Sequence, residues 1–326
     1  PTAKGNTPVT AGSRVPPWPT LRVPRARLAL DTQSWEVQPA GLSITKKPHK
    51  GAVTAGRTLT SVMLPFETVE GSLTATSMTS AQADVLAAFG RDGFALRQQL
   101  GSFLKLSAEQ LDERLPKSTE ALAAAHPGAL APEQAEQFYE DEVGDGHLYE
   151  LAAWHLSSCD YIGDTLRVQG EMAHGLHLDF GGGIGTHALA AAQLPQVEQV
   201  WMVDLNGHNR AFVEHRAQQL GLAHKLTCLR DLNSAALPQR FDSLVCLDVL
   251  EHLADPAAQL RCFADRLTPS TGVALLNWYF FKGFEGEYPF HFDDPEMVKA
   301  FFSTLQDLFL ERFHPHLITA RTYTLR

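Results

Sequence analysis

Short apolar runs alternate with longer stretches of helical spacing through the second half of the chain. The apolar runs predict buried strands over residues 177–180, 200–203, 225–229, 241–247, 272–280, 309–313 and 317–325. The helical spacing between them predicts helices over residues 188–193, 209–220, 256–267 and 295–305. Strands that alternate with helices build parallel sheets covered on both faces, so this half is expected to form a doubly wound α/β domain.

The preceding block, residues 78–174, is helical in pattern throughout and shows no strand-like apolar run. One of its helices is expected to run from residue 133 to residue 143, with Pro132 in the first turn. This block is therefore predicted as a helical region of its own.

Residues 1–77 differ from the rest in composition. They hold nine of the 19 prolines, and nine Lys and Arg residues outnumber four Asp and Glu residues, whereas the whole chain has a formal net charge of −10. No sustained hydrophobic period is present. We expect a disordered or loosely structured extension, and the hypothesis follows that Met78 is the native start.

A glycine-rich turn joins the first predicted strand of the α/β domain to its first predicted helix. It contains Gly181, Gly183 and Gly185, and Asp179 precedes it on the strand. Glycine suits a turn whose backbone angles a Cβ would penalise, and it lets a ligand approach the main chain. The helix that follows presents its N-terminus to the polar groups of that ligand.

A second acidic residue follows the next strand. Asp204, with Leu205 beside it, comes directly after the apolar run 200–203. In a βαβ unit, a carboxylate at this position can accept hydrogen bonds from both ribose hydroxyls of a nucleoside. The chain is therefore expected to bind a cofactor that contains a nucleoside.

The glycine spacing bears on which cofactor this is. A dinucleotide fingerprint matches only weakly, from Gly183 to Ala188. The run Asp179-x-Gly-x-Gly-x-Gly185 instead resembles the first motif of class I S-adenosylmethionine (SAM) dependent methyltransferases. The segment Asp248–Leu253 reads D-V-L-E-H-L and resembles a segment common in the small-molecule branch of that family.

The resemblance covers residues 175–326, about half of the chain. It implies a seven-stranded, mostly parallel sheet of the Rossmann-like methyltransferase type with an N-terminal helical cap. It also implies SAM as cofactor and a small-molecule methyl acceptor as partner. By position, Asp231 would accept from the adenine amino group and Leu232 would pack on the ring, although a solvated loop aspartate is the competing interpretation.

In the family, the helical block would cover the open edge of the cofactor pocket and contact the acceptor. The segment 138–141, which contains Tyr139, is expected nearest the cofactor, although ordinary core aromatics often have this helical spacing. Asp248 follows the fourth predicted strand at the carboxyl edge of the sheet, where ligands of open α/β sheets bind. It is therefore counted among the cofactor-binding residues.

Methyl transfer needs few catalytic side chains, because the sulfonium already activates the methyl group and the protein mainly aligns the reactants. An acceptor that loses a proton needs a base, and histidine is the usual one near neutral pH. His252 and His291, both on predicted loops at the carboxyl edge, are the candidates, with packing roles as the alternative. Glu251 is interpreted as an anchor. No metal is expected, since no ligand spacing such as H-E-x-x-H occurs.

Charge and cysteine content limit the function further. The net charge of −10 disfavours a general nucleic-acid binder, which needs a basic surface. Four widely spaced cysteines without a C-x-x-C pair indicate reduced thiols, and no apolar run reaches the length of a membrane span. No secretory signal is recognised at the N-terminus, so the expected location is the cytoplasm.

Two alternatives from other classes stay open. One is a nicotinamide-dependent oxidoreductase, which rests on the weak dinucleotide match. The other is a non-catalytic relative that binds SAM for regulation. The sequence indicates neither the methylated atom nor the oligomeric state.

Overall fold

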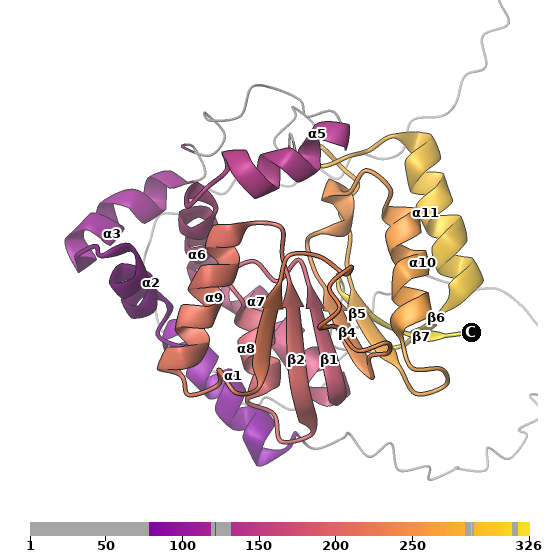
Figure 1. Ribbon diagram of the computed structural model, residues 1–326, viewed down its shortest axis with the longest axis horizontal. Coiled ribbons are helices and arrows are strands. Elements are labelled where there is room, and N and C mark those ends of the chain that lie inside the picture. The colour runs from indigo at the N-terminus through magenta and orange to yellow at the C-terminus, as the bar shows by residue number, and fades with distance from the viewer. Residues whose placement is uncertain (1–77, 119–120, 122–131, 284–287, 289, 315–318) are drawn as a thin grey trace, which may run out of the picture. The chain divides into compact units, whose positions relative to one another are not determined.

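A seven-stranded sheet organises the residues that the computed structural model describes, which are 78–118, 121, 132–283, 288, 290–314 and 319–326 (Figure 1). Its strands are β1 (Gly175–Phe180), β2 (Val197–Val203), β3 (Leu226–Leu229), β4 (Ser243–Cys246), β5 (Val273–Leu276), β6 (Phe309–Arg312) and β7 (Arg321–Leu325). Their order is β3-β2-β1-β4-β5-β7-β6. Strands β1 to β5 run parallel, and β7 pairs antiparallel with β5 and β6. The predicted seven-stranded, mostly parallel sheet is confirmed, whereas the expectations for residues 1–77 lie outside the described residues.

Helices cover both faces of the sheet. Those of the N-terminal block are α1 (Ser80–Asp92), α2 (Leu96–Leu104), α3 (Ala108–Arg114), η1 (Leu115–Lys117), α5 (Pro132–Gln137), η2 (Phe138–Glu142), α6 (Gly146–Ser157) and α7 (Cys159–Met172). Those of the second half are α8 (Thr186–Ala192), α9 (Gly207–Gln219), η3 (Leu250–His252), α10 (Pro256–Arg266) and α11 (Pro295–Leu308). No helix in these ranges is both long and apolar enough to cross a membrane.

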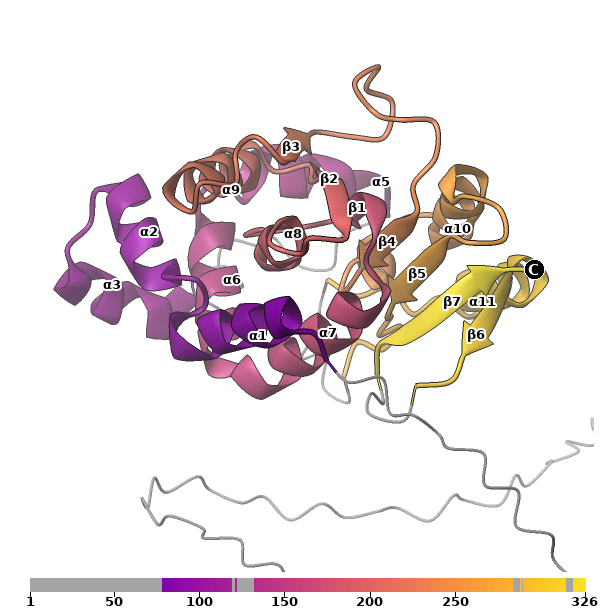
Figure 2. The same cartoon turned by 90° about the horizontal axis from the view of Figure 1, so that it is seen from below.

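Side chains of the central strands alternate between two apolar cores. On β4, Val245 faces the core under α7 and α8, while Leu244 and Cys246 face the core under α10 and α11. Figure 2 shows these two pairs of helices on opposite sides of the sheet. Because successive side chains of a strand point to opposite faces, a strand buried on both sides is apolar along its whole length. This explains the continuous apolar runs in the sequence.

Three predicted elements differ in the structure in where they begin or end or in their type. The strand expected over residues 272–280 ends at Leu276, and the buried side chain of the next residue, Asn277, bonds to Asp248 in the loop after β4. The last strand begins at Arg321, and residues 317–318 of its predicted range lie outside the described chain. The helix expected over 133–143 is α-helical only to Gln137 and continues as a wider π-helical turn, η2.

A buried arginine joins the helical block to the glycine-rich turn. The guanidinium of Arg216, on α9, is fully buried and donates to the carbonyls of Ile184 and Gly93, at 2.7 and 2.8 Å. Its Nε donates to Oε1 of Gln99 on α2, at 2.8 Å. One side chain thus holds the turn after β1, the start of α2 and the end of α1 in register.

We expect Arg216→Met to lower the free energy of unfolding by about 3 kcal/mol, because it leaves three acceptors without this donor. Urea unfolding followed by circular dichroism measures the change. Arg261→Met serves as the matched control, since Arg261 is exposed on α10 and surface changes of this kind stay within about 0.5 kcal/mol. Equal unfolding free energies for the two variants would contradict this role of Arg216.

Candidate functional site

The turn after β1 is built so that only glycine fits at its first position. Gly181 has φ +73°, and a Cβ there would lie 2.3 Å from Cγ2 and 3.0 Å from Cγ1 of Val249. The N–H of Gly181 donates to the carbonyl of Val203, at 2.7 Å, so the turn is fixed between β2 and the loop after β4. Bare main chain therefore lies at the centre of the sheet's carboxyl edge, as the glycine pattern predicts.

Asp179 lies under this turn as a buried carboxylate. Its side chain is 3% exposed, and its Oδ2 has no hydrogen-bond partner within the described residues. Burial is the main cause that raises the pKa of Asp179 to about 7; a backbone hydrogen bond from Ala188 lowers it, and the Asp204 carboxylate raises it further. An orphaned acceptor oxygen beneath a glycine turn suits a cationic ligand group, such as the ammonium of the methionine part of SAM.

Asp204, directly after β2, holds the neighbouring loops together. Its Oδ2 accepts from the N–H of Gly183 at 2.8 Å, and its Oδ1 accepts from the N–H of Asn206 at 2.8 Å and Nδ2 of Asn209 at 3.2 Å. Burial raises its pKa to about 6 against these hydrogen bonds, which lower it. A carboxylate offers about four acceptor positions, so Oδ2 can still accept from a ribose hydroxyl.

The other predicted cofactor residues lie along the same edge. Leu205 is half-buried beside Asp204, and its carbonyl accepts from Arg210 at 2.7 Å. Asp231 follows β3, where its carboxylate accepts from the N–H of Asn233 and from Arg230, and Leu232 is buried in the core under α10. The hydrogen bonds to Asp231 lower its pKa, so it is an ionised acceptor at neutral pH.

Asp248, two residues after β4, has a left-handed backbone with φ +56°. Asn277, the residue after β5, holds it there: the N–H of Asp248 donates to Oδ1 of Asn277 at 2.6 Å, and Nδ2 of Asn277 donates to Oδ1 of Asp248 at 2.7 Å. Burial raises the pKa of Asp248 to about 6, and the Asn277 hydrogen bond lowers it. Backbone strain at a non-glycine residue is typical of functional sites.

The segment around η2 crosses the same edge of the sheet. The hydroxyl of Tyr139 lies 3.1 Å from Nδ1 of His252, and Phe138 stacks on Phe290. Arg230 donates two 2.5 Å hydrogen bonds to the carboxylate of Glu140. Figure 1 shows α5, which precedes η2, beyond the ends of the central strands. The π-helical turn, a form often found at functional sites, thus brings Tyr139 to the predicted catalytic loop.

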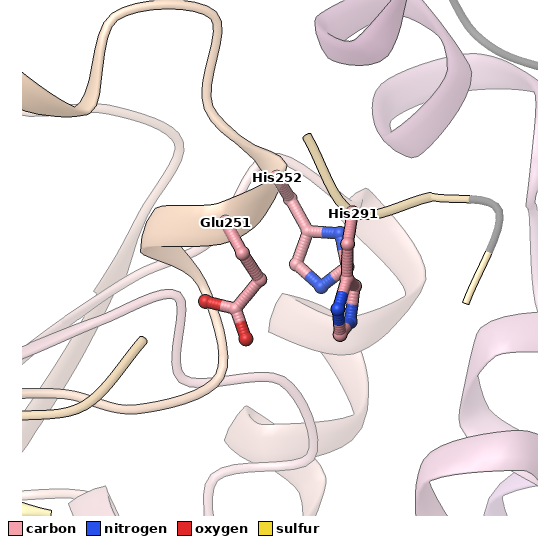
Figure 3. Close-up of side chains that lie close together, drawn as sticks. All are labelled: Glu251, His252 and His291. Atoms are coloured by element: carbon pink, nitrogen blue, oxygen red, sulfur yellow. The ribbon is translucent and has the colours of Figure 1, made fainter. Parts of the chain in front are cut away.

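The two candidate bases face each other beside Glu251 (Figure 3). The rings of His252 and His291 meet edge to face with centroids 4.9 Å apart. Burial lowers the pKa of His252 to about 3 and also lowers that of His291, so both imidazoles are neutral at pH 7. Burial raises the pKa of Glu251 to about 8.

Two residues at the site were not predicted from the sequence. Asn277 fixes Asp248, and the only signal for it was a polar residue inside a strongly apolar run. Asn206 caps α9 and also donates to the carbonyl of Gly144, at 3.0 Å, which ties the helical block to the Asp204 loop. Its signal was a residue of a type favoured at helix caps, three positions before the predicted start of the helix at residue 209.

Comparison with known proteins gives one family. The model of a methyltransferase domain matches residues 157–321. An uncharacterized protein from Synechococcus sp. is 32% identical over 94 residues, which are 28% of this chain and 22% of that protein. The match therefore spans about a fifth of the length of this curated relative.

Solved structures with similar folds include an O-methyltransferase from neocarzinostatin biosynthesis, in complex with SAM and 2-hydroxy-5-methyl naphthoic acid. It is 20% identical with a TM-score of 0.45, over 66% of this chain and 70% of that chain. A SAM-dependent methyltransferase from Clostridium acetobutylicum is 15% identical with a TM-score of 0.36, over 51% and 89% of the two chains.

Gly181→Ala is expected to abolish binding of S-adenosylhomocysteine, the demethylated cofactor, because the new Cβ has no room against Val249. Gly221→Ala is the matched control. Its φ is +72°, and a Cβ there meets no atom within 4 Å. Both variants lose about 1 to 2 kcal/mol from the left-handed backbone. Calorimetric titration should separate them, and equal affinities would show that the turn does not contact the cofactor.

The pKa of Asp179 predicts a pH-dependent stability. A carboxyl with a higher pKa in the folded chain binds its proton more tightly there, so its ionisation costs stability as the pH rises from about 4 to about 7. Asp179→Asn removes this cost. The melting temperature of the variant relative to the parent should therefore rise between pH 5 and pH 7.5, as scanning calorimetry can measure. A constant difference across this range would contradict the raised pKa.

Proposed function

The chain belongs to the methyltransferase-domain family, and from this premise we propose that it transfers a methyl group from SAM to a small-molecule acceptor. Membership of this family supports an enzyme that uses SAM as its cofactor. The acceptor class, the roles of individual residues and the division into a cap (78–174) and a SAM-binding domain (175–326) are the proposed parts.

The main support for the proposal is the contact between the hydroxyl of Tyr139 and the ring of His252 at the carboxyl edge. The glycine turn, the orphaned oxygen of Asp179 and the remaining acceptor position of Asp204 lie along this same edge. A ligand bound there would have the cofactor residues on one side and the segment around η2 on the other. Contacts from two sides of this kind support a small acceptor.

The residues divide the work of the reaction between them. SAM supplies an activated methyl group when bound. Asp204 would bind the ribose of SAM, and the main chain of the glycine turn would lie against the cofactor. Asp179 would bind its ammonium group. Asp231 and Leu232 would contact its adenine. Segment η2 would exclude water and align the acceptor, which is most of what in-line methyl transfer requires.

A hydroxyl acceptor fits the neutral histidines best, because it must release a proton as the new bond forms. His252 and His291 are unprotonated at neutral pH and lie together at the edge. They are the proposed proton acceptors. The net charge of −10 supports a small molecule over a nucleic acid as the substrate.

We place the reaction in the cytoplasm on the basis of the four thiols. All four cysteines are free, and Cys246 is fully buried. Reduced cysteines of this kind are typical of a reducing compartment.

We expect Asp204→Asn to weaken S-adenosylhomocysteine binding by about 30-fold, which corresponds to about 2 kcal/mol for a lost charge-assisted hydrogen bond. Isothermal titration measures the affinity. Asp265→Asn, an exposed acidic residue on α10, is the matched control and should bind as the parent does. No binding by the parent would reject the proposed use of this edge as the cofactor site.

The acceptor class has a separate test. The full chain is incubated with SAM labelled in the methyl group and with the low-molecular-mass or the macromolecular fraction of a cell extract. We expect label in the small-molecule fraction, and none with Gly181→Ala. Label only in the protein or nucleic-acid fraction would overturn the small-molecule proposal, and cofactor binding without any turnover would favour the non-catalytic alternative.

A further inference from the structure

We infer that Glu251, His252 and His291 form a binding site for a divalent transition-metal cation, placed to hold the oxygen of the methyl acceptor. The inference rests on the proposed function, because it concerns the acceptor end of the same site. It departs from the expectation of no metal, which was drawn from spacing along the chain alone.

The three side chains converge from two separate segments. Glu251 and His252 belong to η3, and His291 comes from the loop after β5. Their potential ligand atoms all lie within 4.8 Å of one another. Figure 3 shows the Glu251 carboxylate and the ring nitrogens turned toward a common space. The N–H of Phe292 donates to the carbonyl of Glu251 at 2.8 Å, so the two segments are joined by the backbone as well.

The hydrogen bonds of the two rings prepare them to bind a cation. Nδ1 of His252 lies 3.0 Å from the carbonyl of Phe290, and Nδ1 of His291 lies 3.1 Å from the carbonyl of Phe281. A carbonyl can only accept, so each Nδ1 carries the proton and each neutral ring has its lone pair on Nε2. Metal-binding histidines are oriented in this way by a carbonyl or carboxylate on the other nitrogen.

The carboxylate supplies an independent observation. Glu251 is 1% exposed, and among the described residues neither of its oxygens makes a hydrogen bond of good geometry. The ionised form of a buried carboxyl group without a good hydrogen bond is costly unless it is paired or coordinates a metal. The acidic side chain of Asp248 lies near enough to add to its repulsion. A cation would offset both costs.

The ligand set indicates the kind of cation. Two imidazole nitrogens and one carboxylate suit zinc and other first-row transition metals better than calcium or magnesium, which prefer oxygen ligands. Three protein ligands leave a coordination position for a further oxygen. The site lies next to the glycine turn, since Val249, which contacts Gly181, is two residues from Glu251.

A cation in this position would lower the pKa of an acceptor hydroxyl that binds to it and fix its oxygen toward the cofactor. In the transfer, the hydroxyl proton passes to solvent and the oxygen forms the new bond to the methyl carbon. The bond from that carbon to sulfur breaks, its electron pair stays on sulfur, and S-adenosylhomocysteine leaves. The histidines would then act as ligands rather than as the base.

The test uses the full chain after dialysis against a chelator and then against chelator-free buffer. Zinc chloride is titrated calorimetrically into the parent, Glu251→Gln and His291→Gln. Glu198→Gln and His224→Gln are matched controls, because both residues are exposed and lie outside the cluster. We expect one tight site in the parent and in both controls. Each ligand variant should lose more than the 10- to 100-fold typical of changes beyond the ligands themselves.

S-adenosylhomocysteine binding is measured on every sample, which reports folding and separates the two proposals. Cofactor binding without a tight zinc site, or unchanged zinc affinity in both ligand variants, would overturn the metal site alone and return the histidines to the role of base. Zinc binding without cofactor binding would reject the proposed function. If Glu251→Gln does not fold, the zinc affinity of His291→Gln tests the metal site, because His291 lies at a half-buried loop position.

Discussion

Burial of acidic side chains at the carboxyl edge of the sheet is the constraint on which this site depends. Asp179, Asp204, Asp248 and Glu251 are each largely withdrawn from solvent, and burial is the first cause that raises each pKa. Asp204 offsets the cost with three hydrogen bonds, whereas Asp179 has an oxygen without a partner. The hydrogen bonds of Asp204 therefore hold the loops of this edge together, whereas other buried carboxyl groups lack partners that would stabilise a negative charge.

The helical block and the sheet depend on each other through polar contacts. Arg216 joins α1, α2 and the glycine turn from below, and the Arg230 to Glu140 pair joins η2 to the loop after β3. The first set is fully buried and the second is partly exposed. Exposed ion pairs contribute little to stability, so η2 is held mainly by buried Phe138, which stacks on Phe290, and by Tyr139, which contacts His252.

Much of the fold could be predicted from the sequence, because strands buried on both faces have continuous apolar runs. The positions of the glycine turn, Asp204 and Asp248 at the carboxyl edge could be predicted because each follows an apolar strand closely in the sequence. The end of β5 and the π-helical turn η2 could not, because Asn277 and Tyr139 are placed by partners distant in the chain. For the same reason the cluster of Glu251 with His252 and His291 has no sequence signature, as its members meet only after the loop following β5 folds back.

The charge balance of the edge links the two proposals. Among the described residues, Arg210 donates to the carbonyls of Asp204 and Leu205, and Arg230 pairs with Glu140 and Asp231. No guanidinium or ammonium there pairs with Asp179, Asp248 or Glu251. In the proposed complex, the countercharge comes from bound ligands: the ammonium and sulfonium of the cofactor on one side, and a metal cation on the other. On this reasoning, each cationic ligand reduces the negative potential that attracts the other, so binding of one should weaken binding of the other.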